Sequence, residues 1–243
     1  MAKTIRFKDL IVFENEHLIA INKPANISSL HERFESKFQS VIEMCKEENE
    51  NYSLCHRLDR ETSGVMLISK NQEVYKHLAM QFEKRTIQKE YHAVVSASVN
   101  IHDLEVDLPL YTDSKRRVQV SRKSGKPSTT YFNTIQQFKH FTLLSCKPLT
   151  GRLHQIRVHA FSQNLPLVSD HLYNGKDAFL SQIKKKVNLK NDEESPMINR
   201  VALHAFAIEF EQLDGSKQRI EAPYPKDFEV LVKLLNKYDS LDS

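Results

Sequence analysis

The chain has 243 residues, of which 40% are hydrophobic, so it is long and apolar enough for a buried core in one large or two small domains. Its 35 lysines and arginines exceed its 31 acidic residues, and the formal net charge of +4 is weak evidence for an anionic partner. Since no apolar run has the length of a signal peptide or a membrane span, we expect a cytoplasmic protein without a membrane partner. The three cysteines share no CxxC spacing, which argues against a disulfide scaffold or a cysteine zinc site.

The first half of the chain alternates strand and helix patterns. In chain order we expect a strand over 17–24, an amphipathic helix over Ser36–Glu48 capped by Ser36, a buried strand over 65–70, a helix through Val74, Leu78 and Phe82 capped by Asn71, and a strand over 90–99.

The second half begins with a hairpin pattern. In chain order we expect hairpin strands over 129–135 and 140–146, a helix over 151–161, a central strand over 200–210 and a closing helix after Pro225. Strands outnumber helices and cluster in hairpins, which predicts an α+β fold with a largely antiparallel mixed sheet and flanking helices. No linker divides the chain, so residues 1–243 are expected to form a single domain, with 176–196 as an exposed insertion.

One short polar segment, CHRLDRETSG (55–64), is too polar for a core and contains one of only 5 glycines. Asp59 lies there between Arg57 and Arg60, and a carboxylate flanked by cations is expected to stay ionised. Such a group suits nucleophilic or electrostatic work better than general-acid work. A turn that precedes a buried strand is also a place where side chains commonly line a cleft.

A second segment, LTGRLHQIRVH (149–159), repeats this chemistry, with a glycine followed by arginines and histidines. On a helix, His154, Arg157 and Phe161 would share one face. The two segments could form one site in which Arg157 pairs with Asp59 across a cleft. The alternative is that both are structural salt-bridge clusters.

Basic residues concentrate in KRRVQVSRKSGK (115–126), which contains no acid, and in Lys184–Lys186. These stretches are either solvated loops or phosphate-contacting patches. Other chemistries fit less well. His154 and His159 miss the i, i+4 spacing of a helical zinc pair, no third ligand joins His56 and Asp59, and no GxSxG is present. We therefore expect no metal.

Five separated motifs together resemble the RluA-type pseudouridine synthases, in the same order and over essentially the whole chain. The motifs are ENEHLIAINKP (14–24), HRLDRETSGVMLISK (56–70), KEYHAVV (89–95), LTGRLHQIRVHA (149–160) and RVALHAF (200–206). The resemblance implies the pseudouridine synthase fold with a central RNA-binding cleft. It also implies isomerisation of uridine to pseudouridine in ribosomal RNA or a transfer RNA stem-loop, without a cofactor or a metal.

The resemblance also implies roles by position. Asp59 matches the aspartate that attacks the uridine, so that the base detaches, rotates and rejoins through carbon. Tyr91 matches the tyrosine that stacks on the target base, and Arg157 the basic residue that pairs with the aspartate. Arg57 matches the arginine that helps to hold the flipped-out nucleotide, and Leu203 an apolar wall of the base pocket.

Two loops depart from the family pattern, with Ala25-Asn26 in a glycine region and Ser169 where glycine is common. The chain also starts too close to its catalytic motifs for the small N-terminal RNA-binding domain of many relatives. We therefore expect a monomer that recognises RNA with its catalytic domain, through basic residues that include Arg116, Arg117 and Arg122. The alternatives are a catalytically silent RNA-binding protein of this fold and, more remotely, a hydrolase that uses His56, Asp59 and His154.

Overall fold

The computed structural model describes residues 5–31, 39–187 and 193–241. Within it the chain divides into two compact units. The first consists of Met1–Lys89 and Ala205–Pro223, and the second of Glu90–His204 and Tyr224–Ser243. The chain therefore passes from one unit to the other inside two strands and once more before the last helix. That both units act as a single domain stays a prediction.

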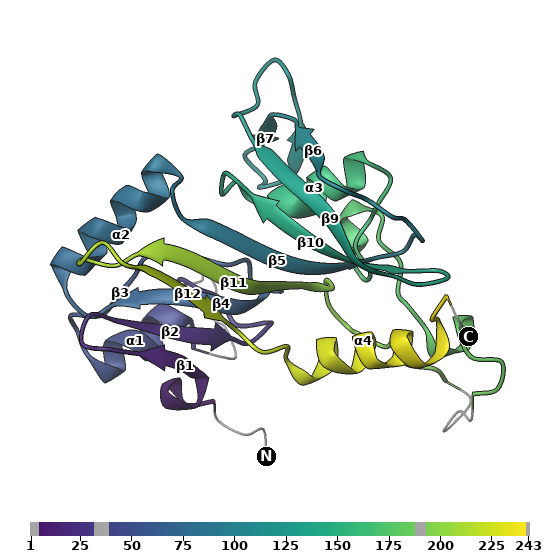
Figure 1. The fold of residues 1–243 in the computed structure, drawn as a ribbon, viewed down its shortest axis with the longest axis horizontal. Coiled ribbons are helices and arrows are strands. Elements are labelled where there is room, and N and C mark those ends of the chain that lie inside the picture. The colour runs from purple at the N-terminus through teal and green to yellow at the C-terminus, as the bar shows by residue number, and fades with distance from the viewer. Residues whose placement is uncertain (1–4, 32–38, 188–192, 242–243) are drawn as a thin grey trace. The chain divides into compact units, whose positions relative to one another are not determined.

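The first unit is built around strands that run side by side in the order β1, β2, β4 and β11, with β3 paired to β4 and β12 to β11. Its elements are η1 (Phe7–Leu10), β1 (Ile11–Glu14), β2 (Leu18–Lys23), α1 (Val41–Glu48), β3 (Ser53–Leu54), β4 (Ser63–Ser69), α2 (Gln72–Lys84), β11 (Leu203–Glu211) and β12 (Lys217–Glu221) (Figure 1). β2 pairs with β4, and β11 with β12, in antiparallel register. Every residue of β4 is buried, as a strand in the middle of a sheet requires.

The second unit carries the antiparallel order β5, β10, β9 and β6, together with a separate two-stranded ribbon of β7 and β8. Its elements are β5 (Gln88–Val95), β6 (Leu104–Asp107), β7 (Leu110–Thr112), β8 (Val118–Val120), β9 (Thr129–Gln137), β10 (Thr142–Pro148), α3 (Gln155–Ser162), η2 (His171–Tyr173), η3 (Leu180–Gln182) and α4 (Lys226–Tyr238) (Figure 1). Together the units give the α+β class and the largely antiparallel sheet that the sequence predicts.

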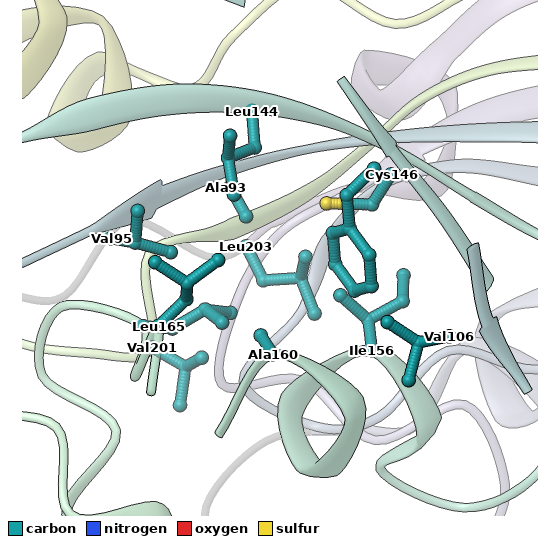
Figure 2. Packing of buried hydrophobic residues seen from close by; sticks show 12 residues of the cluster. Ala93, Val95, Val106, Leu144, Cys146, Ile156, Ala160, Leu165, Val201 and Leu203 are labelled. Atoms are coloured by element: carbon teal, nitrogen blue, oxygen red, sulfur yellow. The ribbon is translucent and has the colours of Figure 1, made fainter. Parts of the chain in front are cut away.

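Alternate residues of β5 enter two different apolar clusters of the second unit. Ala93 and Val95 belong to a cluster that includes residues of α3, and Val94 belongs to one that includes residues of α4. This alternation follows from the two-residue period of a strand. Figure 2 shows the first cluster, where Leu203 lies between strand residue Ala93 and the helix residues Ile156 and Ala160.

Most of the expected elements are confirmed, and their boundaries differ where a local contact overrides the pattern. The helix expected from Ser36 starts at Val41, because Ser40 is its N-cap and forms a capping box with Glu43. Ser36 itself lies outside the described residues. The helix expected from Gly151 starts only at Gln155, because the preceding residue has a left-handed backbone, with φ of 51°. The central strand starts at Leu203 instead of residue 200.

That 176–196 is an inserted segment stays a prediction; in the part that the structure describes (176–187 and 193–196), some of its residues are packed and others are exposed. Ala178 is buried and belongs to the cluster that contains α4, and Ile183 packs against that cluster. Lys185 and Lys186 are exposed. Among the described residues, no helix combines the length and apolar character that a membrane crossing needs.

Candidate active site

Asp59 lies half-buried in the turn between β3 and β4 of the first unit. The turn is fixed on both sides of it. Ser29 Oγ donates to the carbonyl of Leu58 at 2.7 Å and accepts from the Leu58 amide at 3.1 Å. The Thr62 amide donates to the Asp59 carbonyl at 3.1 Å. Arg57 is exposed, so the segment presents a cation to solvent beside a carboxylate with a firmly held backbone.

A buried ammonium group ties this turn to the end of β2. Lys23 is 0% exposed, and its Nζ donates to the carbonyls of Pro24 at 2.8 Å, Ile27 at 2.9 Å and Arg60 at 3.2 Å. The Asn26 amide also donates to the Arg60 carbonyl, at 2.8 Å. Asn26 has a φ of 65°, in the left-handed region that asparagine tolerates better than most residues, which explains why this chain manages without glycine there. Hydrogen bonds from a charged donor are stronger than neutral ones, so those of Lys23 hold the Asp59 turn strongly to the end of β2.

The glycine of the segment has a clear structural reason. Gly64 has a φ of 122°, and a Cβ at this position would lie 2.2 Å from the carbonyl oxygen of Ala205 in β11. Only glycine allows β4 to begin this close to another backbone.

His56 also has a structural task. Its Nε2 accepts a hydrogen bond from the Leu67 amide at 3.0 Å, and its ring lies 4.9 Å from that of Phe82. Burial, assisted by the positive charge of Lys89, lowers the pKa of His56 to about 3. The imidazole is therefore neutral near pH 7 with Nε2 already engaged, which argues against the hydrolase that would use it as a base.

Arg157 is 4% exposed on α3 in the second unit and forms a bidentate pair with Asp170. Its Nε and Nη2 donate to the two carboxylate oxygens at 2.8 and 2.6 Å. The sequence-based pairing of Arg157 with Asp59 stays a prediction, and the partner that the structure gives Arg157 within its own unit is Asp170. The face predicted for the helix is confirmed, because the side chains that share it, those of His154, Arg157 and Phe161, all lie against Tyr173.

Tyr91 and Leu203 lie together in the second unit. Tyr91 is half-buried on β5 opposite Cys146 of β10, and it packs against the apolar cluster of Figure 2. Leu203, 3% exposed, is a member of that cluster, as is Ile156, the neighbour of Arg157 on α3. The structure thus brings an aromatic ring, an apolar wall and the helix that carries Arg157 to one cluster.

The basic stretch 115–126 is more ordered than a simple surface loop, because it contains β8. Val118 of β8 packs in one cluster with Val158 of α3 and with Tyr173. Arg116 and Arg117 are exposed at the turn of the ribbon, where Arg117 pairs with Asp113 at 2.7 Å. Arg122 follows β8 and is exposed as well. The ribbon that carries these cations is therefore packed against the side chains that also surround Arg157.

Sequence reasoning missed Lys23, Ser29, Asp170 and Tyr173, which hold the predicted site residues. Lys23 and Ser29 act through backbone groups, and such contacts leave no residue pattern. Asp170 is 0% exposed, and a charged residue in a stretch with apolar neighbours (Leu165–Tyr173) was the signal that a buried ion pair forms there. No group of three histidines, cysteines or acidic residues that could hold a metal occurs among the described positions.

Comparison with known proteins gives a consistent result. The family model described as RNA pseudouridylate synthase matches residues 17–162. The proteins named ribosomal large subunit pseudouridine synthase C from Vibrio vulnificus, Escherichia coli K12 and Buchnera aphidicola are 32%, 33% and 35% identical to the chain. These alignments cover 96%, 92% and 90% of this chain and 71%, 69% and 68% of the relatives.

Two solved structures share the fold. Human RNA pseudouridylate synthase domain containing 4 superposes with a TM-score of 0.74 at 22% identity, covering 94% of this chain and 95% of that one. Human RNA pseudouridylate synthase domain containing 1 gives 0.67 at 20% identity, covering 95% of both chains. The fold, the matched family model and the relatives agree, and the chain belongs to the RNA pseudouridylate synthase family.

Proposed function

We propose that this chain isomerises specific uridines to pseudouridine in ribosomal RNA, with Asp59 as the catalytic group. The observation that carries the proposal is the match to the family over residues 17–162, which contains Asp59 on a turn fixed by Ser29 and Lys23. Ribosomal RNA is preferred over transfer RNA because the relatives at 32–35% identity are named for the large ribosomal subunit. A ribosomal RNA substrate also fits the cytoplasmic location expected from the sequence.

The reaction needs no external reagent. In this proposal the Asp59 carboxylate bonds to C1′ as the bond between C1′ and N1 breaks. The detached uracil rotates, and C5 then displaces the carboxylate from C1′, so that the C1′–C5 bond forms and Asp59 is regenerated. The C5 proton is lost and N1 gains one, so atoms and electrons balance within the nucleotide. This balance agrees with the expectation that the protein uses neither a cofactor nor a metal.

The target base must leave its stack before Asp59 can reach the sugar. Extrusion costs a few kcal/mol, and stacking of the flipped uracil on Tyr91 offsets about 1–3 kcal/mol of this. In this proposal Leu203 forms the apolar wall of the base pocket, and exposed Arg57 helps to hold the extruded nucleotide. Because Tyr91 and Leu203 pack in one cluster, their spacing is set by the core of the second unit.

Arg157 would pair with the catalytic aspartate. The bidentate contact with Asp170 supports this role, because it fixes the plane and direction of the guanidinium before any substrate arrives. A group held in advance loses little conformational freedom in the transition state, which is where a pre-organised charge contributes most.

The phosphates would be bound by Arg116, Arg117 and Arg122 at the β7–β8 ribbon. Reversing these three charges to glutamate should weaken RNA binding and flatten its salt dependence, because each phosphate contact contributes about 0.7–0.9 to the slope of log K against log salt. The single-turnover rate at saturating enzyme should change little. Unchanged binding, measured by filter retention at several salt concentrations, would reject this role.

The test of the proposed function is a pseudouridine map of total RNA from cells with and without the gene. Wild type and Asp59→Ala serve as the complementing pair. We expect one or more uridines of large-subunit RNA to lose modification, and only the wild type to restore it. A purified wild-type protein that binds an RNA transcript without modifying it would instead identify the catalytically silent RNA-binding protein.

A further inference from the structure

A chain of polar side chains crosses the second unit behind Tyr91. Ser145 Oγ of β10 donates to Glu90 Oε1 at 2.8 Å, and the same oxygen lies 3.6 Å from His92 Nε2. His92 Nδ1 lies 2.5 Å from the phenol oxygen of Tyr224, just before α4. The Tyr224 ring in turn meets the ring of His204 edge-on, with centroids 5.4 Å apart. The proposed chemistry uses none of these side chains.

The proton positions in this chain follow from the surroundings of the phenol. Burial, reinforced by the negative charge of Glu90, raises the pKa of Tyr224 to about 12. The phenol therefore keeps its proton and has a hydrogen to donate in its hydrogen bond with His92 Nδ1. A histidine that accepts at Nδ1 carries its own proton on Nε2, which faces Glu90. Both described contacts of His92 are thus compatible with a single tautomer and ring orientation.

The position of these polar side chains relative to Tyr91 suggests what they do. Glu90 and His92 flank Tyr91 in β5, so their side chains project to the opposite face of the strand. The pairing of β5 with β10 extends from Val95 to Tyr91, which lies opposite Cys146. Tyr91 is therefore at the end of this pairing. At that point Ser145 and Tyr224 hold the residues on both sides of Tyr91 from behind.

The start of α4 also holds the strand that carries Leu203. Arg200, 3% exposed, forms a bidentate pair with Asp227 of α4 at 2.7 and 3.0 Å, and its Nη1 donates to the Leu203 carbonyl at 3.1 Å. Tyr224 just before α4 and Asp227 in its first turn therefore contact, through His92 and Arg200, both strand segments that bear the proposed base-pocket residues.

We propose that Glu90, His92 and Tyr224 form a positioning network that sets the Tyr91 ring for stacking on the extruded uracil. The inference rests on the proposed function. The network touches neither the RNA nor the reacting atoms, and it acts through the backbone of β5.

The experiment uses the full-length protein and an in vitro transcript of Escherichia coli large-subunit ribosomal RNA. Tyr224→Phe and His92→Leu each remove the hydrogen bond, and His92→Asn restores an acceptor at the place of Nδ1. We expect the first two to lower the single-turnover rate at saturating enzyme about threefold to tenfold, the range that one hydrogen bond typically supports. We expect RNA affinity to change less than about twofold, and His92→Asn to recover most of the rate.

A double substitution separates positioning from general stability. In a Tyr91→Ala background there is no ring to position, so Tyr224→Phe should have no further effect on the rate. His140→Leu is the control, because it removes another histidine contact near the other end of β10, in which the 60% exposed His140 side chain meets buried Asp239 at 2.6 Å. It should lower the melting temperature without lowering the rate.

The outcomes are distinct. Full activity of both Tyr224→Phe and His92→Leu, or equal rate losses with and without Tyr91, would overturn the network. A wild-type protein that modifies no transcript and no cellular RNA would instead refute the proposed function, whatever the variants do.

Discussion

The pair of Arg157 and Asp170, whose side chains are 4% and 0% exposed, should contribute strongly to stability. Asp170→Asn preserves shape but leaves a buried guanidinium without its counter-charge, and the new amide nitrogen faces a donor instead of an acceptor. Breaking one partner of a buried ion pair typically costs about 3–5 kcal/mol. Against a total stability of about 5–15 kcal/mol, this is a large fraction.

The assay is urea unfolding followed by circular dichroism. With a slope of about 2 kcal/mol per molar urea, the loss corresponds to a midpoint lowered by about 1.5–2.5 M. Asp113→Asn is the matched control, because Asp113 pairs with Arg117, whose side chain is 72% exposed, and such pairs contribute about 0–1 kcal/mol. If the two variants unfolded at the same urea concentration, our account of Arg157 as a buried, pre-oriented charge would be wrong.

Three further changes test the turn that carries Asp59. Gly64→Ala should abolish stable folding or cost more than about 3 kcal/mol, since its Cβ would lie 2.2 Å from a backbone oxygen; a normal melting curve would contradict this. The pKa of His56 is about 3 in the folded protein against an ordinary value of 6.5, so the unfolded chain binds the additional proton between these values. The free energy of unfolding should thus fall as the pH drops below about 6.5, by up to about 1.4 kcal/mol per pH unit. His56→Gln keeps an acceptor for the Leu67 amide but does not titrate, so it should remove this pH dependence in chemical denaturation at pH 4–7. Lys23→Met removes the charged donor of three backbone carbonyls, including that of Arg60, and should lower the free energy of unfolding by about 2–4 kcal/mol together with the single-turnover rate. An unchanged rate in a destabilised protein would show that the hydrogen bonds of Lys23 do not position Asp59.

The sequence was sufficient wherever a local rule governs the outcome. The helix α4 follows from apolar residues at helical spacing after Pro225, and α2 from the same spacing with Asn71 as its cap, which the structure confirms. The family and the candidate residues Asp59, Tyr91 and Arg157 follow from ordered motifs, since each motif is a continuous stretch. Arg157 and Phe161 share a face by helical geometry, whereas His154 precedes α3 and meets Tyr173 from a left-handed backbone.

Tertiary structure decided the contacts that join distant stretches of the chain. Ser40 displaces Ser36 as the start of α1 because its partner Glu43 completes a capping box. His56 is a neutral acceptor, not a base, because folding buries its ring beside Phe82.

The sequence also could not predict the partners of the candidate site residues. Asp170 is the partner of Arg157 because the loop after α3 returns it to that helix. Ser29 and Lys23 hold the Asp59 turn through carbonyl and amide groups that every residue carries. Such contacts depend on where the backbone passes, and backbone groups are identical along the chain, so only the folded structure determines which of them meet.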